Sequence, residues 1–345
     1  MPSAAARPDL AETRKRTVDW RGIAEIRLVS TEDGPGRGQR LILARNAAGL
    51  AFEVAVDRGF DLSALGWKGI NLGWHGPNRM PFPPAPTTED GRRGMLRAFD
   101  GFLVTCGLDH FGVPSAASAD HFIYPHRQQA HYAFHGRVAL QGAELRGYGL
   151  DMEAAEPVLW CEAIVRQTAL FGEVLSLKRR IELPVFGTTI RLSDVVTNDG
   201  YRPARHGVLY HFNLGYPLLD RDTQLLGDCT PRDIEHFAAV PPVPADDFVE
   251  LVDRLTVKPA RDGIATVGLT NPKLGGGVSV GIRQRVDQLA ELMMWRCYQS
   301  GIFVVGIEPH TALSADRLGH EGGANPDFLE AGETRRYELD VVVTE

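Results

Sequence analysis

The string Tyr210–Leu214 (YHFNL) places an imidazole between two aromatic residues, with an amide two positions further on. Alternate side chains of a strand point to the same face, so His211 and Asn213 would share one face and Phe212 the other. An imidazole that faces a polar cleft titrates near neutral pH, which makes His211 a candidate general acid or base. The alternative is a core histidine held by a backbone carbonyl.

A carboxylate, Glu308, follows the apolar run at 302–307 and directly precedes a proline. This position indicates that Glu308 emerges from the interior of a sheet, where a carboxyl group can take part in proton transfer. The alternative is a solvated carboxylate at the end of a strand.

His135 and Arg137 lie two positions apart, so on a strand they would present an imidazole beside a guanidinium. Arg137 would donate paired hydrogen bonds, which suit vicinal hydroxyls, a carboxylate or a phosphate. A structural salt bridge is the alternative for Arg137. Arg58 is a similar candidate, because Gly59 would let the backbone pass close to a ligand.

Two further side chains are candidates for the wall of a cleft. Trp295 could stack on the apolar face of a ligand, whereas the alternative is a tryptophan of the core. Asp109 follows the string TCGL at 105–108 and either lines the cleft or belongs to a structural turn.

Histidines are densest between His121 and His135, with His126 and His131 between them. Spacings of five residues put successive histidines on opposite strand faces, and Pro125 interrupts the run, so we assign no metal ligand here. His131 and His135 nevertheless share a face. This leaves open, as an alternative, a metal-dependent isomerase or lyase that acts on a keto sugar.

Short apolar runs separated by glycines and prolines along the whole chain are typical of strands and turns. Alternation with a period of two predicts strands at 51–57, 175–183, 188–197 and 336–344. The sequence therefore predicts an all-β fold, a large antiparallel β-sandwich with few short helices.

One short helix is expected at 246–255, where apolar residues recur at helical spacing. The stretches 74–94 and 230–244, rich in proline and polar residues, are expected to be long surface loops. No linker composition separates two cores. Residues 1–18 are therefore expected to form an N-terminal arm and residues 19–345 a single sandwich domain.

Composition disfavours several classes of partner. The 345 residues carry 44 acidic and 37 basic side chains without a block of like charges, which argues against a nucleic-acid or membrane surface. Apolar stretches fall far short of the roughly 18 residues of a membrane span, and no apolar leader is visible. We expect a cytoplasmic monomer or homodimer whose four cysteines are reduced core residues.

Several strings resemble one family. YHFNLGYPLL at 210–219 resembles the HxYFNL-type segment of aldose 1-epimerases (galactose mutarotases), and VVGIEP at 304–309 resembles their late glutamate segment. DRGFDLSALGWKG, TCGLDHFG, HGRVA, DVVTNDG and GIEPHTA, spread over residues 57–312, are similar to an uncharacterised DUF4432-type branch of these proteins. The chain lacks the NHxxHGG string of typical galactose mutarotases, so galactose is not implied as the substrate.

The resemblance implies a carbohydrate isomerase in which Glu308 is the catalytic base and His211 the catalytic acid. Interconversion of anomers needs a proton taken from the C1 hydroxyl and another delivered to the ring oxygen, and it requires no metal or organic cofactor. A small-molecule sugar would be the partner. The substrate-binding residues would be His135, Arg137, Arg58, Asn213, Asp109 and Trp295. A non-catalytic sugar-binding or sensor protein is the alternative, although a binder needs no acid and base pair.

Overall fold

The computed structural model describes residues 9–120, 126–311 and 327–345. Of these described residues, 46% lie in strands and 9% in helices, which confirms the all-β prediction. The strands expected at 51–57, 175–183, 188–197 and 336–344 are β3 (Leu50–Ala55), β11 (Val174–Pro184), β12 (Thr189–Asn198) and β22 (Thr334–Thr344).

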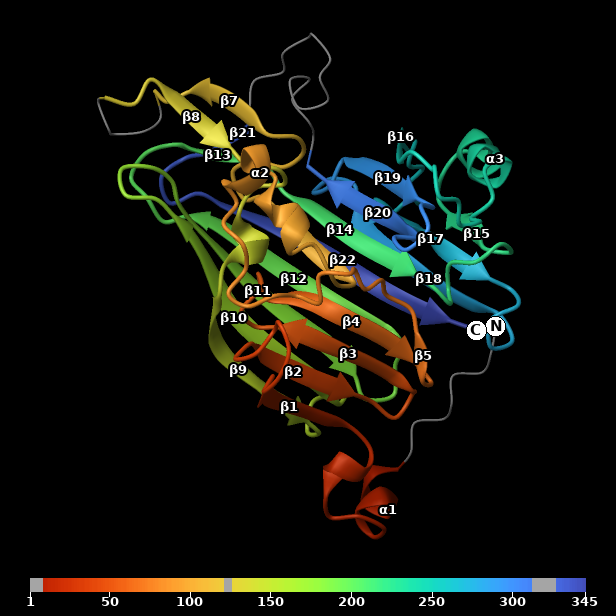
Figure 1. Cartoon of the computed structure of the whole chain (residues 1–345). Helices are drawn as coiled ribbons and strands as arrows, with labels where there is room; N and C mark the ends of the chain where they lie inside the picture. The colour runs from red at the N-terminus through yellow and green to blue at the C-terminus, as the bar shows by residue number, and fades with distance from the viewer. Residues whose placement is uncertain (1–8, 121–125, 312–326) are drawn as a thin grey trace.

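The strands form two layers (Figure 1). One layer is an eight-stranded antiparallel sheet in the order β15-β17-β18-β22-β12-β11-β10-β9. Its other strands are β9 (Ala143–Asp151), β10 (Val158–Thr168), β15 (Gln224–Gly227), β17 (Ile264–Asn271) and β18 (Val278–Arg285).

The other layer consists of two five-stranded antiparallel sheets. The first has the order β1-β2-β3-β4-β5 and includes β1 (Glu25–Ser30), β2 (Arg40–Arg45), β4 (Asp61–Trp67) and β5 (Ile70–Asn71). The second has the order β16-β19-β20-β14-β6 and comprises β6 (Leu103–Cys106), β14 (Leu209–Gly215), β16 (Leu251–Arg254), β19 (Glu291–Cys297) and β20 (Val304–His310).

The remaining elements are short. Two strand pairs lie outside the layers, β7 (Ser115–Ser118) with β8 (Gln129–Tyr132) and β13 (Ala204–His206) with β21 (Asp327–Leu329). The helices are α1 (Leu10–Arg14), α2 (Glu89–Arg92) and α3 (Pro231–Ala239), with 3-10 turns η1 (Trp20–Gly22), η2 (Gly94–Arg97) and η3 (Val138–Leu140). None of these helices is long and apolar enough to cross a membrane. All four cysteines are buried and unpaired.

In the second five-stranded sheet, β6, β14 and β20 are buried on both faces. On one face, side chains such as Tyr210, Phe212 and Ile307 belong to the main apolar core. On the other face, Val104 belongs to a smaller cluster that includes Phe99 from the segment between β5 and β6. This second face carries the side chains of His211 and Glu308, because they alternate with the core residues along β14 and β20.

The prediction of a helix at 246–255 is wrong. Residues Leu251–Arg254 form strand β16, whose backbone pairs with β19. Four apolar residues are too few to distinguish the period of a helix from that of a strand, and backbone pairing with β19 stabilises the strand. The helix of this region is α3, inside the expected loop, and it begins at a capping box formed by Thr230 and Asp233. The sequence therefore did carry a helix-start signal.

The division into an arm at 1–18 and a single domain at 19–345 stays a prediction.

The fully buried Arg179 on β11 connects the two layers. Its guanidinium donates to both carboxylate oxygens of Asp194 on β12 and to Asp61 on β4. The hydroxyl of Tyr210 on β14 donates to Asp194, at 2.7 Å. This network holds β14 from its core side, and so it fixes the strand that carries His211.

Arg179→Met should strongly destabilise the protein, because it leaves Asp61 and Asp194 buried without a cation. We expect a loss of about 3–5 kcal/mol in the free energy of unfolding, measured by urea denaturation. Lys178→Met on the same strand is the control, since its side chain is 52% exposed and should cost less than about 1 kcal/mol. Equal losses in the two variants would contradict a structural role for the buried network.

Candidate active site

His211 and Glu308 lie opposite each other on neighbouring strands. The register of β14 and β20 pairs Phe212 with Ile307, so the preceding residue on β14 faces the following residue on β20. Directly opposed residues of an antiparallel pair share one face. The Nε2 atom of His211 lies 3.1 Å from Oε1 of Glu308, and each side chain is only 5% exposed.

Because Gly306 has no side chain, there is room beside it for His211 and Glu308. It lies on the same face as Glu308, because it is two residues away and is paired with Asn213 and Trp295. A Cβ atom at this position would lie 2.7 Å from Cε1 of His211 and 2.8 Å from Oε1 of Glu308. Any side chain here would therefore displace the pair.

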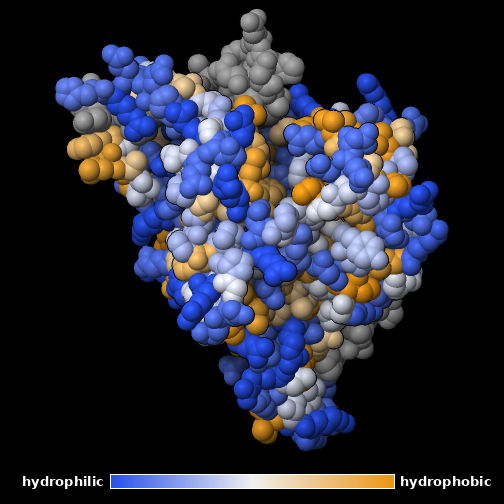
Figure 2. Space-filling model, viewed as in Figure 1, coloured by the Kyte–Doolittle hydropathy of each residue, from blue (hydrophilic) through white to orange (hydrophobic). Residues whose placement is uncertain are grey.

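Aromatic rings surround the imidazole of His211. The ring centroids of Phe99, Trp295 and His135 lie 4.9, 5.4 and 5.8 Å from it, all with their edges toward a face. Trp74 packs in turn against Phe99. Figure 2 shows a hollow on this side of the molecule between the region of α2 and that of β19 and β20, with hydrophobic residues along its wall.

Burial shifts the two pKa values of the pair in opposite directions. Desolvation raises the pKa of Glu308 to about 8, and the carboxylate of Glu250 adds to the rise. Desolvation lowers the pKa of His211 to about 3, although its hydrogen bonding with Asn213 opposes this shift. Between these values both groups are neutral, so besides the N–H of the neutral imidazole the pair retains one titratable proton that either partner can hold. An ion pair differs from this state only by transfer of that proton across the 3.1 Å contact.

His135 and Arg137 do not lie on a strand, which corrects the expectation. His135 sits in a turn with a φ of +56°, and the two side chains diverge as a result. The ring of His135 packs against His211, and burial lowers its pKa well below the usual value. Arg137 instead forms ion pairs with Glu173 and Asp109, so its charge belongs to a salt-bridge network.

Arg58 is buried and holds a loop of the site. Its guanidinium donates to the carbonyl oxygens of Ala98 and Ala139. Since Ala98 directly precedes Phe99, these bonds hold the segment that packs on His211. The Nη1 atom of Arg58 has no hydrogen-bond partner within the described residues.

Asn213 and Trp295 flank the pair along the strands. The amide of Asn213 donates to the carbonyl oxygens of Gly101 and His211, at 3.0 and 3.2 Å. The indole N–H of Trp295 donates to the exposed carboxylate of Glu250, at 2.8 Å. Asn213 therefore ties β14 to the segment before β6, and Glu250 fixes the orientation of the Trp295 ring.

Sequence reasoning missed Phe99 and Glu250. Phe99 follows the turn η2 inside a long irregular segment, where no periodicity indicates which side chain points to the site. Glu250 directly precedes β16, in the stretch that was expected to be a helix.

Among the described residues, no group of three or more His, Cys, Asp or Glu side chains is arranged to hold a metal ion. Of the histidine-rich run, His131 is exposed on β8, whereas His121 lies outside the described residues.

The two-layer arrangement of the strands matches that of solved structures described as sugar epimerases or as galactose mutarotase-like proteins. A protein described as a "putative aldose 1-epimerase" from Klebsiella pneumoniae subsp. pneumoniae MGH 78578 matches with a TM-score of 0.80 at 20% identity, over 93% of this chain and 83% of that chain. A galactose mutarotase-like protein from Clostridium acetobutylicum matches with a TM-score of 0.63 at 12% identity, over 94% and 99% of the two chains.

A galactose 1-epimerase from Lactobacillus acidophilus NCFM matches with a TM-score of 0.56 at 12% identity, over 93% of this chain and 99% of that chain. These likenesses define the class: the chain has the galactose mutarotase-like fold. It belongs to the family described as Domain of unknown function (DUF4432), whose model matches residues 36–343. The resemblance seen in the sequence is thus confirmed. No protein of curated function matches the sequence.

The stability of the Glu308→Gln variant relative to the wild type should increase as the pH rises. An unfolded glutamate ionises near its ordinary pKa of 4.5, whereas the folded carboxyl ionises only near 8. The wild type therefore loses stability as the pH rises between these values, and the glutamine variant does not. Melting temperatures from about pH 5 to about pH 9 measure the difference. A difference that stays constant over this range would contradict the raised pKa.

Proposed function

We propose that this protein interconverts the anomers of a free or modified sugar, with His211 and Glu308 as the proton-transferring pair. The observation that carries the proposal is the 3.1 Å contact between His211 Nε2 and Glu308 Oε1 on one face of adjacent strands. The mutarotase-like fold supports it at the level of architecture, and a fold alone leaves the activity open.

The contact between the two groups suits this reaction because the hydroxyl oxygen O1 and the ring oxygen O5 of a pyranose are bonded to the same carbon. Two groups within hydrogen-bond distance of each other can therefore reach both oxygens. Glu308 as the carboxylate takes the proton of O1–H, and the imidazolium of His211 donates a proton to O5. The C1–O5 bond breaks as the C1=O double bond forms.

Rotation about the C1–C2 bond then exposes the other face of the aldehyde. The same groups, now with their roles reversed, return the protons and close the ring to the other anomer. The pair ends as it began, so turnover consumes nothing.

In the resting site both groups are neutral, so the acid and base must first form by transfer of the proton from Glu308 to His211. A sugar in the hollow brings hydroxyl groups that hydrogen-bond the ionised carboxylate, and this favours the charged form. The sugar itself thus helps to create the catalytic state.

The residues around the pair are proposed to bind and position the sugar. Trp295 is proposed to stack on the apolar face of the sugar, and His135 to hydrogen-bond a hydroxyl. Arg58 is proposed to donate to the sugar through its unpartnered Nη1. Asn213 is proposed to support substrate binding by holding β14 in place. The ion pair between Arg137 and Asp109 is proposed to hold the loop next to the substrate.

Removal of either partner should abolish anomer exchange. NMR saturation transfer between the α and β signals of a panel of aldoses and sugar acids measures the rate. We expect the wild type to accelerate exchange of at least one sugar, and His211→Ala and Glu308→Gln to lower that rate by about 100-fold or more.

His236→Ala is the matched control for these variants, because this exposed imidazole lies on α3, outside the site, and should leave the rate unchanged. A wild type that binds a sugar without accelerating its exchange would favour a binding or sensor protein instead.

The rate of exchange should be flat in the neutral range and fall as the pH rises above about 8. Below that value the pair retains its one proton, whereas above it Glu308 loses the proton and His211 has none to donate. A series of exchange rates between about pH 6 and about pH 10 tests this. A rate that rises through pH 8 would mean that a deprotonated pair is the active form.

A further inference from the structure

A second cavity, of about 510 Å³, lies against the sheet β1–β5, and its described lining residues include neither His211 nor Glu308. Its floor comes from three adjacent strands, and its walls come from the β1–β2 loop and from the segment after β5. The floor residues are Leu41, Glu53 and Ser63, and the walls are formed by Thr31 to Gln39, by His75 to Met80 and by Asp100.

The two walls are packed against each other. The N–H of Phe82 donates to the carbonyl oxygen of Pro35, at 2.9 Å. A Cβ atom at Gly36 would lie 3.2 Å from the carbonyl oxygen of Met80, so the absence of a side chain permits this close approach. The cavity is therefore built from fixed elements.

Two buried polar groups in this cavity have unused hydrogen-bonding capacity. Gln39 is 2% exposed and Ser63 is 4% exposed. The Nε2 atom of Gln39 and the Oγ atom of Ser63 have no hydrogen-bond partner in the described part of the chain. Both atoms belong to residues that line one cavity. Buried polar atoms without partners are costly and rare in proteins, so a ligand that reaches them and completes their bonds would stabilise this region.

The charges around the cavity indicate what kind of ligand fits. Asp33, Glu53 and Asp100 supply three carboxylates, against the cations Arg79 and, when protonated, His75. Asp100 lies 3.5 Å from the imidazole of His75 and raises the pKa of that ring. The excess of carboxylates disfavours an anion. Neutral hydroxyl groups suit the site, because each can donate to a carboxylate while it accepts from an amide or a hydroxyl.

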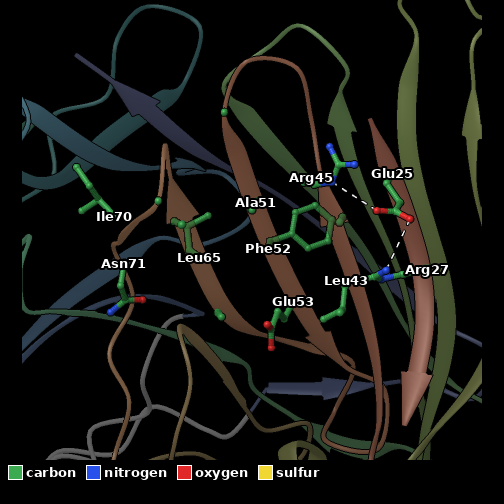
Figure 3. Close-up of a pocket in the computed structure, with 15 residues that line it drawn as sticks. Glu25, Arg27, Leu43, Arg45, Ala51, Phe52, Glu53, Leu65, Ile70 and Asn71 are labelled. Atoms are coloured by element: carbon green, nitrogen blue, oxygen red, sulfur yellow. Dashed lines mark ion pairs between the residues drawn. The ribbon is translucent and has the colours of Figure 1, made fainter. Parts of the chain in front are cut away.

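The neighbouring pocket drawn in Figure 3 lacks this character. Three of its charged side chains form ion pairs, since Glu25 lies 3.4 Å from Arg45 and 3.8 Å from Arg27. Glu53 is the one residue that lines both. The unpartnered buried groups distinguish the cavity at Gln39 and Ser63 from it.

We propose that the cavity at Gln39 and Ser63 is a second saccharide site, which binds a neutral mono- or disaccharide through its hydroxyl groups. Its volume lies in the range of small-molecule sites. The inference goes beyond the proposed reaction, because no residue of this cavity takes part in proton transfer.

The side-chain amide of Gln39 reports directly on this site. In a chain labelled with ¹⁵N-glutamine, the Gln39→Met variant identifies the Gln39 signal by its loss. The probes are methyl α-D-glucopyranoside and maltose, with inorganic phosphate as the anionic comparison. The methyl glycoside cannot open its ring, so it is not a substrate for anomer exchange.

We expect a saturable shift of the Gln39 amide signal with at least one of the two sugars and none with phosphate. Ser63→Ala should weaken the binding about tenfold or more, whereas Glu308→Gln should leave it unchanged. Glu53→Gln, which changes a half-buried floor residue, provides a second test if Ser63→Ala does not fold.

The absence of a saturable shift with both sugars would overturn the proposal, as would an equal response to phosphate. Loss of the sugar response in Glu308→Gln would also overturn it, because the sugar would then be acting through the first site. Anomer exchange is measured separately, so either proposal can fail while the other stands.

Discussion

Glu308 and His211 are held 3.1 Å apart with almost no access to water, and the residues around them must preserve this buried contact. A buried carboxylate and a buried imidazolium are each unfavourable alone, so the pair settles as a neutral imidazole and a protonated carboxyl group. The surroundings preserve that condition. The rings of Phe99, Trp295 and His135 exclude water on one side, and Gly306 carries no side chain that would push the pair apart.

The sandwich holds this pair through its strands. β14 carries His211 on one face and Tyr210 on the other, and Tyr210 is bonded to the buried network of Arg179 and Asp194. Because backbone pairing fixes the register between β14 and β20, Glu308 lies directly opposite His211, and no loop is needed to bring the two side chains together. Strands position side chains more rigidly than loops do, which suits a proton transfer that depends on a short distance. The loops supply the walls, where more variation is tolerated.

Much of the fold and part of the site could be predicted from the sequence. Alternation identified β3, β11, β12 and β22, and the expectation that His211 and Asn213 would share one face of a strand agrees with their place on β14. The contact of His211 with Glu308 could not come from periodicity, because it depends on which strands are neighbours in the sheet, and only the family resemblance linked the two residues. His135 and Arg137 diverge because His135 adopts a left-handed backbone conformation that few non-glycine residues take. Phe99 lies in a segment without a regular period, and Glu250 lies in a stretch whose apolar spacing predicted a helix, so no local pattern marked either residue.

Neutron diffraction from crystals exchanged into D₂O near pH 7 examines the shared proton most directly, because it locates deuterium on each atom of the pair. The account predicts two deuterons on His211 and Glu308 together, one of them between His211 Nε2 and Glu308 Oε1. A single deuteron on the two side chains would show Glu308 ionised beside a neutral imidazole at this pH, and it would contradict the account.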